Sequence, residues 1–493
     1  MTSGLWTAQR RPLTVGLTAT VTFVAAEALA VVTVMPLVAR DLNGLRLYGF
    51  VFSAFLLGTM TGIVAAGRAA DRRGPAVPYV AGIALFCAGL AVAGLAPSML
   101  VLVLGRALQG LGAGAVPAVA YVAIGRSLPA HLRARMMAVL STAWVAPGLA
   151  GPALSAEVAR TFGWRWVFLG LLPFILLIAP VAMPALVRLG PPQTQSGDGH
   201  RLADGIGVAV AAGLLVAGLT LAAGSGSRPG ATGAVPASAP SAAALLAGGL
   251  MIVAGCGLGL PVLRRLLPAG TLRARSGLPA TVLSRSLLTF AFFGADAFVT
   301  LAITILRHRG PMVAGVAVTG STLAWTAGAW VQARLSTRWE GRRQVRTGLV
   351  IILAGIAGLD LMLSAQVPVA EGIAAWTVAG FGMGMAYSPI TLLVLKAAPA
   401  GREGWASAAL NLADVLGSAL GIGLGGAAIS AAVSLGWSLA AGVAIAFTLT
   451  ILAGATGLAI SRQLPAGPTG ASDRALPEAG TPAPVAVAEG TPP

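Results

Sequence analysis

The sequence has little charge. Only 10% of its residues are Asp, Glu, Lys or Arg, and its mean hydropathy is +0.86. A soluble domain carries about 25% charged residues, and a soluble fold of this length would still need a polar exterior. The composition therefore excludes an ordinary soluble protein and favours a chain whose apolar surface faces lipid.

Cysteine and histidine are also scarce. The two cysteines, Cys87 and Cys256, lie inside apolar runs, so no disulfide framework or metal-ligand spacing exists, and we expect no metal site. The chain lacks G-x-x-x-x-G-K-[ST], H-E-x-x-H and G-x-S-x-G. These absences exclude the nucleotide-driven motor and the hydrolases that such motifs mark. We expect no enzyme and no cofactor, and a gradient must supply any energy.

Long apolar runs are what the sequence has instead. A membrane-spanning helix needs about 20 apolar residues, and roughly fourteen such runs occur. They lie at 14–38, 48–68, 76–96, 98–124, 136–159, 164–187, 203–224, 241–263, 279–305, 312–333, 347–365, 370–395, 404–431 and 435–461. The first run is too long for a signal peptide and is expected to be retained. The sequence predicts an all-α integral membrane protein.

Positive charge is distributed unevenly between the loops. The formal net charge is +17, and Lys396 is the only lysine among 32 basic residues. With the N-terminus placed inside, most arginines fall in inside loops and few in outside loops. This bias follows the positive-inside rule with both termini cytoplasmic. It explains the basic composition without a nucleic-acid partner.

The order of the runs indicates an internal repeat. The pair Pro129–Ala130 recurs later in the chain as Pro399–Ala400, and Gly151 recurs at the same spacing as Gly421. We predict two pseudo-symmetric six-helix bundles plus two inserted helices, an architecture that places a site between the halves. The predicted segments are a cytoplasmic N-terminus (1–13), the first bundle (14–188), a linker with two extra helices (189–277), the second bundle (278–461) and a disordered cytoplasmic tail (462–493).

The loop after the second run has a distinctive pattern of charge and glycine. It contains Gly67, Asp71, Arg72, Arg73 and Gly74. The final glycine suits a tight turn, and an acid beside bases at a helix terminus can pair with a neighbouring helix end. We predict a gating loop, with an ordinary positive-inside loop as the alternative.

Two further motifs lie within spans. Arg106 stands in the run L-V-L-G-R-A-L-Q-G-L-G, and a guanidinium in hydrocarbon must find a partner or water. Pro147, Gly148, Gly151 and Pro152 form P-G-L-A-G-P in the fifth run, where proline would kink the helix and glycine would permit close packing. The alternatives are a purely structural arginine and a generic proline kink.

These motifs resemble those of the major facilitator superfamily. The loop is similar to G-x-L-a-D-R-x-G-R-R, the fourth run to l-x-x-x-R-x-x-q-G-x-g, and the fifth to g-x-x-x-G-P-x-x-G-G, with Ser155–Ala156 replacing the last glycine pair. Glu27, nine residues before Pro36, resembles the acid of the fourteen-span drug/proton antiporter branch. The resemblance implies a monomeric proton-coupled exporter of the plasma membrane.

Acidic and polar residues within the spans are the candidate residues for proton coupling and substrate binding. Glu27 lies near mid-membrane, where burial disfavours the charged carboxylate and makes protonation near neutral pH plausible; permanent pairing with an arginine is the alternative. The candidates in the second half are Asp296, Asp414, Arg285, Asn411 and Tyr387, with Asp360 ranked below them. An intramembrane ionisable residue indicates function by default, although any one of these could be structural.

We therefore predict a proton-coupled secondary transporter that works by alternating access and exports a small lipophilic or cationic compound. Its expected partners are a small-molecule substrate, protons and the lipid bilayer, with no nucleic acid. Two alternatives remain open. An uncoupled facilitator or importer of a metabolite is compatible with the Ser155–Ala156 departure. A polytopic membrane enzyme or receptor is disfavoured because the acids are dispersed at mid-depth.

Overall fold

The computed structural model describes residues 5–8, 10–190, 200–223, 241–336, 338–399 and 403–465. In this part of the chain, thirteen helical segments are long and apolar enough to cross a membrane. This result confirms the predicted all-α membrane class. Residues 191–199 and 224–240 of the predicted linker, and the predicted tail beyond 465, lie outside the described residues.

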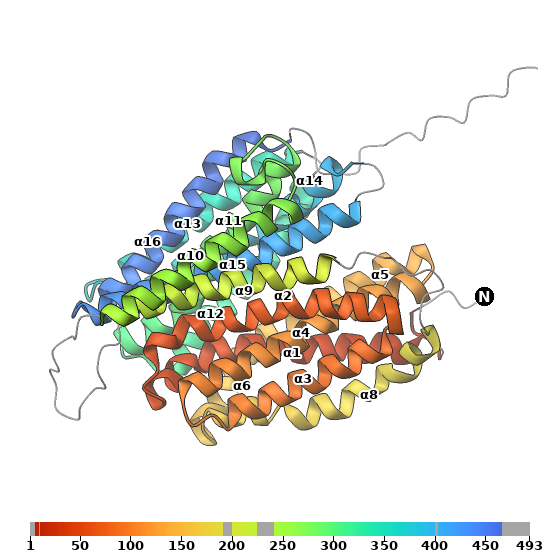
Figure 1. Ribbon diagram of the computed structural model, residues 1–493, viewed down its shortest axis with the longest axis horizontal. Helices are drawn as coiled ribbons and strands as arrows, with labels where there is room; N and C mark the ends of the chain where they lie inside the picture. The colour runs from red at the N-terminus through yellow and green to blue at the C-terminus, as the bar shows by residue number, and fades with distance from the viewer. Residues whose placement is uncertain are drawn as a thin grey trace, which may run out of the picture.

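The helices form two bundles joined by an inserted pair (Figure 1). The first bundle consists of α1 (Arg11–Asp41), α2 (Tyr48–Arg73), α3 (Ala76–Gly94), α4 (Met99–Ser127), α5 (Ala130–Thr142), α6 (Val145–Thr161), α7 (Arg165–Leu169) and α8 (Leu172–Leu189). The inserted pair is α9 (His200–Ala222) and α10 (Ala242–Leu266). The second bundle consists of α11 (Leu278–Leu301), α12 (Pro311–Leu335), α13 (Gly341–Leu361), α14 (Val369–Ala397), α15 (Glu403–Ser434) and α16 (Leu439–Ile460).

Local sequence signals set several helix ends. Ser98, Ser241 and Ser438 are N-caps whose side-chain oxygens accept hydrogen bonds from the backbone N–H three residues later. These bonds satisfy one of the donors left free at a helix start. At the C-terminal end of α2, Gly74 terminates the helix with φ of +81°. Glycine adopts this conformation without steric cost.

The predicted span 136–159 is divided in the structure. α5 ends at Thr142 and α6 begins at Val145, with Ala143 and Trp144 between them. Pro147 favours a break at this point, although Pro152 lies inside α6 without interrupting it. Pro147 cannot donate to the carbonyl of Ala143, and its ring would clash with that carbonyl in a continuous helix. The predicted kink is therefore a full interruption, which reduces the number of uninterrupted spans below the predicted count.

Glycines bring helices into backbone contact within each bundle. A Cβ at Gly110 would lie 2.1 Å from the Phe55 carbonyl oxygen, so α4 and α2 touch through their backbones. In the second bundle, a Cβ at Gly380 would lie 2.2 Å from the Ser321 carbonyl oxygen of α12. Gly380 follows Gly110 at the spacing that the predicted repeat requires. The pseudo-symmetry of the halves is therefore expressed in equivalent helix crossings.

The two bundles contact each other toward the predicted outer side. Thr300 Oγ1 of α11 donates to the Val32 carbonyl oxygen of α1 at 2.8 Å, and Ser53 Oγ of α2 donates to the Ala419 carbonyl oxygen of α15 at 2.9 Å. At the opposite end, α5 packs on α1, α4 and α6 of its own bundle. The ribbons of the two bundles diverge toward that end, where the N-terminus lies (Figure 1).

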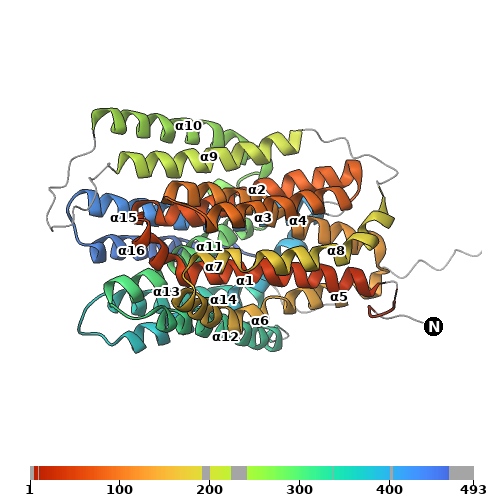
Figure 2. The same cartoon turned by 90° about the horizontal axis from the view of Figure 1, so that it is seen from below.

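The inserted helices cover the seam between the bundles. α9 packs on α2 of the first bundle and on α15 of the second, and Figure 2 shows α9 and α10 stacked on that side. Their contact is a separate apolar cluster that includes Leu57 of α2, Val208 of α9 and Leu416 of α15. The extra pair therefore touches both halves and shields one side of their junction.

Candidate functional site

The first group of intramembrane polar residues joins α1 to α4. Arg106 Nη1 donates to Glu27 Oε1 and, at 2.9 Å, to Gln109 Oε1, while Gln109 Nε2 donates to Glu27 Oε1 at 3.2 Å. The Glu27 and Arg106 side chains are only 1% and 2% exposed. A charge this deep in hydrocarbon needs a partner of opposite charge. Glu27 and Arg106 are each other's partner.

The Glu27 group still contains unpaired polar atoms. Glu27 Oε2 and Arg106 Nε are buried and have no hydrogen-bond partner among the described residues. Leaving a buried polar atom without a partner costs about 1–3 kcal/mol. Because Oε1 receives all of the hydrogen bonds, Oε2 is an atom to which a proton could add without breaking any of them.

The second group of polar residues joins α11, α14 and α15. Arg285 donates from Nε to Asp414 Oδ1 and from Nη1 to the Tyr387 carbonyl oxygen, both at 2.7 Å. The Tyr387 hydroxyl donates to Asp414 Oδ2 at 3.1 Å. The Arg285 side chain is 4% exposed and that of Asp414 is 20% exposed. Asp414 is therefore ion-paired like Glu27, but its side chain is more exposed than that of Glu27.

Aromatic rings continue from this group across the second bundle. Trp325 lies 5.4 Å from Tyr387 and 5.6 Å from Phe292 between ring centres. Phe292 in turn stacks on Trp376 at 4.9 Å. Rings at these separations attract one another beyond their apolar contact. They form an aromatic wall, defined here as Phe292, Trp325, Trp376 and Tyr387, beside the Asp414 carboxylate.

Asp296 differs from the other two acids. It lies on α11, partly buried, and makes no ion pair with any described residue. Its carboxyl group interacts with the Trp376 indole and the Tyr48 hydroxyl, yet Trp376 Nε1 has no hydrogen bond of normal geometry among the described residues. This carboxyl group therefore lies beside an aromatic side chain, without a compensating cation.

The internal repeat relates Asp296 to Glu27. Trp376 follows Arg106 at the same spacing by which Gly380 follows Gly110. Asp296 follows Glu27 at almost that spacing and lies, like Glu27, on the first helix of its bundle. Each bundle thus has an acid on its first helix, but the acid of the first bundle faces an arginine and the acid of the second faces a tryptophan.

The residues of the predicted gating loop lie at the end where the bundles diverge, but all except Gly74 form the last turns of α2 rather than a loop. Asp71, Arg72 and Arg73 are exposed, and Asp71 makes no ion pair within the described ranges. A Cβ at Gly67 would meet no atom within 4 Å. Asp71, Arg72 and Arg73 therefore make no ion pair with the second bundle among the described residues, and they do not belong to either group of intramembrane acids.

The predicted packing motif of the fifth run lies between the two bundles. A Cβ at Gly148 would be 2.5 Å from Thr322 Cγ2 of α12, and a Cβ at Gly315 of α12 would be 3.3 Å from the Pro152 carbonyl oxygen. At Gly151 the nearest atom would be Leu29 Cβ, at 4.0 Å. The motif therefore contributes to the contact of α6 with α12 rather than to the groups of acids.

Two predicted polar residues stand apart from these clusters. Asn411 is exposed, one turn before Asp414 on α15, and the structure does not join it to Arg285 or Tyr387. Asp360 is the penultimate residue of α13, with Oδ1 buried and without a hydrogen-bond partner among the described residues. Neither residue belongs to the polar groups described above.

Sequence reasoning missed Gln109 and the aromatic wall. Gln109 was visible as a polar residue one helical turn after Arg106, where a shared partner is geometrically possible. The wall was not visible in the same way, because Phe292, Trp325 and Trp376 belong to three separate apolar runs in which aromatic residues are unremarkable. Only the packing of α11, α12 and α14 brings them together.

The sequence of this chain matches the model of a known protein family. The model described as the Major Facilitator Superfamily matches residues 15–422. The chain belongs to the major facilitator superfamily. Members of this superfamily are transporters, so this protein is a multi-pass membrane transporter and not an enzyme.

Individual relatives agree with this family assignment. A protein of Mycobacterium tuberculosis named as a probable multidrug-efflux transporter is 28% identical over 433 residues, which is 86% of this chain and 88% of that protein. A triacylglyceride transporter of Mycolicibacterium smegmatis is 28% identical over 418 residues, covering 80% of this chain and 71% of that protein.

Solved structures support the fold. A POT family transporter in complex with 5-aminolevulinic acid superposes with a TM-score of 0.67 at 13% identity, covering 94% of this chain and 98% of that chain. A bacterial homologue of the lysosomal transporter Spinster, in an inward-facing and unoccupied conformation, gives a TM-score of 0.58 at 14% identity and covers 93% and 98% of the two chains. At these identities the likeness concerns the fold alone.

Proposed function

We propose that this major facilitator superfamily transporter is a proton-coupled exporter of small lipophilic or cationic compounds. The observation that carries the proposal is the unequal pairing of its intramembrane acids. Glu27 and Asp414 each have an arginine partner, whereas Asp296 has none among the described residues. A carboxyl group without an ion-pair partner can gain or lose a proton without breaking a salt bridge. Asp296 is therefore suited to take up and release a proton.

The substrate class follows from the aromatic wall beside Asp414. Aromatic faces attract cations as well as apolar groups, and the Tyr387 ring already has the Arg285 guanidinium 3.2 Å from its centre. A lipophilic cation could replace that guanidinium on the ring and beside the carboxylate. The multidrug-efflux name of the mycobacterial relative supports the export of drug-like compounds.

Coupling would arise from competition between protons and substrate for the acids. Protonation removes the charge of a carboxylate and so changes which conformation of the two bundles is stable. We propose that Asp296 carries the exchanged proton, that Glu27 with Arg106 senses the change in the first bundle, and that Asp414 receives the substrate. The loop at Asp71 would close the inner end in the opposite conformation.

The orientation and setting are part of the proposal. The arginine bias of the loops supports cytoplasmic termini, and with this orientation the diverging ends of the bundles face the cytoplasm. An exporter must collect its substrate from that side. We propose a monomer in the plasma membrane, with substrate, protons and lipid as its partners and the proton gradient as its energy source.

Replacing Asp296 with Asn is expected to abolish transport driven by a proton gradient. The amide keeps the shape of the side chain but cannot exchange a proton. Proteoliposomes loaded with a pH-sensitive dye would be given ethidium, a lipophilic aromatic cation, and both ethidium flux and proton flux would be recorded. Wild-type protein should couple the two fluxes, and D296N should lose the substrate-dependent proton flux completely.

Asp360→Asn is the matched control, because it makes the same chemical change in the same bundle but away from Asp296 and Asp414. This variant should retain coupled flux.

Glu27→Gln tests the first bundle in the same assay. Wild-type proton flux in E27Q would remove Glu27 from the coupling role, and wild-type coupling in D296N would refute the proposal for Asp296. Ethidium equilibration that persists after the proton gradient is collapsed, with no proton flux, would instead favour an uncoupled facilitator.

A further inference from the structure

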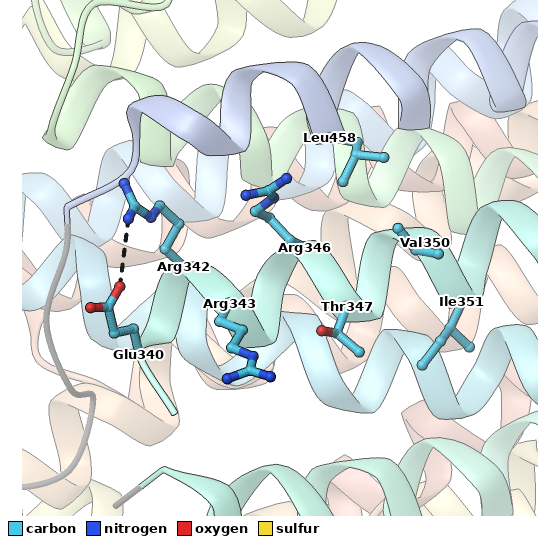
Figure 3. A pocket seen from close by; sticks show the side chains of 8 residues that line it. All are labelled: Glu340, Arg342, Arg343, Arg346, Thr347, Val350, Ile351 and Leu458. Atoms are coloured by element: carbon cyan, nitrogen blue, oxygen red, sulfur yellow. Dashed lines mark ion pairs between the residues drawn. The ribbon is translucent and has the colours of Figure 1, made fainter. Parts of the chain in front are cut away.

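A groove of about 600 Å³ lies between the start of α13 and the end of α16. Its lining changes character along its length, from charged side chains to apolar ones (Figure 3). The charged end is formed by Glu340, Arg342, Arg343 and Arg346, and the rest by Thr347, Val350, Ile351 and Leu458. Nothing in the proposed transport cycle uses these residues.

The charged end of the groove carries an excess of positive charge. Arg342 Nη2 lies 3.6 Å from Glu340 Oε2, with both side chains at least a third exposed, so this pair is weak. The Arg343 guanidinium lies 4.4 Å from the centre of the Trp339 ring. Arg346 is exposed and has no ion pair among the described residues. The charged end of the groove thus contains three guanidinium groups and one carboxylate.

The side chains follow α13 in two parallel rows. Arg342, Arg346 and Val350 succeed one another at four-residue intervals, and so do Arg343, Thr347 and Ile351. Residues at this spacing lie on one face of a helix, so each row runs from a guanidinium to an aliphatic side chain over roughly 12 Å. Figure 3 shows Arg342 and Arg346 pointing toward α16, which supplies Leu458.

We propose that this groove binds an anionic phospholipid of the leaflet that faces the predicted inner side. The lipid phosphate would lie among Arg342, Arg343 and Arg346, and an acyl chain would lie along Val350, Ile351 and Leu458. Basic pockets between membrane helices bind anionic headgroups, and guanidinium groups suit phosphate oxygens through paired hydrogen bonds. The apolar part of the groove distinguishes a lipid from a free anion, which would gain nothing from it.

The bound lipid would connect α13 with α16 inside the second bundle. The groove lies outside the seam between the bundles, so the proposal does not depend on the direction or the coupling of transport. A ligand that binds the folded protein shifts its unfolding equilibrium. An anionic lipid should therefore both remain bound and stabilise the detergent-solubilised protein, whereas a zwitterionic lipid with the same chains should do neither to the same degree.

Native mass spectrometry of the full chain in detergent tests this proposal, with dioleoyl phosphatidylglycerol as the probe and dioleoyl phosphatidylcholine as its neutral counterpart. Wild-type protein should retain phosphatidylglycerol at collision energies that remove phosphatidylcholine. The triple variant R342Q/R343Q/R346Q should lose at least about tenfold in phosphatidylglycerol affinity, since each bidentate phosphate contact removed weakens charge-assisted binding. Val350→Trp, which fills the groove but keeps the arginines, should also reduce retention.

The matched control is R264Q/R265Q/R273Q, which removes three arginines from exposed positions on the same predicted side, at the end of α10 and just after it. It should retain phosphatidylglycerol as wild type does. Equal retention of the two lipids, or equal losses in the triple variant and the control, would refute the site. Wild-type retention in V350W, or displacement of the lipid by millimolar inorganic phosphate, would refute the acyl-chain contact and leave only an anion site.

Discussion

Replacing Gly110 with Val is expected to prevent the close crossing of α2 and α4 and to remove most of the folded protein. A Cβ at this position would lie 2.1 Å from the Phe55 carbonyl oxygen, and a backbone atom cannot move aside as a flexible side chain does. Overpacking costs about 1–3 kcal/mol and occasionally more, and this contact belongs at the upper end. The measurement is the Tm of the purified protein and its yield as a single species in size-exclusion chromatography.

Gly125→Val on the same helix is the matched control. A Cβ there would meet no atom within 4 Å, so only the difference in helix propensity should be felt. Gly380→Val tests the equivalent crossing of α14 with α12, where the Ser321 carbonyl oxygen would be 2.2 Å from the new Cβ. We expect it to match G110V. If G110V melted at the temperature of G125V, the close backbone contact between α2 and α4 would be wrong.

The helices and the two-bundle arrangement could be predicted from the sequence. Hydropathy predicts each helix because every span must satisfy its backbone hydrogen bonds internally, and the constant spacing of the repeated signals predicts two similar bundles. The break between α5 and α6 was only partly visible. Pro147 indicates a kink, but whether a helix bends or stops at a proline depends on what packs around it, and here α12 lies against the following residues.

The candidate site was predictable residue by residue but not as a set of partners. Glu27 and Arg106 are conspicuous in the sequence because a single charge in hydrocarbon is costly. Their pairing is a contact across 79 residues, which no local pattern reveals. Arg285 shares a helix with Asp296, yet the structure pairs it with Asp414 on α15. Which acid keeps an arginine and which does not is decided by helix packing, and that difference supports the proposed coupling role of Asp296.

Replacing Arg106 with Leu is expected to destabilise the protein strongly, because the change leaves the Glu27 carboxylate buried without a cation. Removing one partner of a buried ion pair costs about 3–5 kcal/mol, whereas replacing both partners by neutral groups of similar volume is often nearly neutral. The double variant E27Q/R106L should therefore recover most of the stability lost in R106L. A double-mutant cycle on thermal or denaturant unfolding in detergent measures this recovery as a coupling free energy.

The cycle separates a structural role of the pair from a role in transport. If the pair only holds α1 to α4, the stabilised double variant should also recover coupled ethidium and proton flux. If Glu27 takes part in coupling as proposed, E27Q/R106L should recover most of its stability and still lack substrate-dependent proton flux, because the charged pair that responds to the protonation of Asp296 has been removed. A coupling free energy near zero would contradict both roles, since it would mean that the Glu27 carboxylate does not depend on Arg106 for its charge.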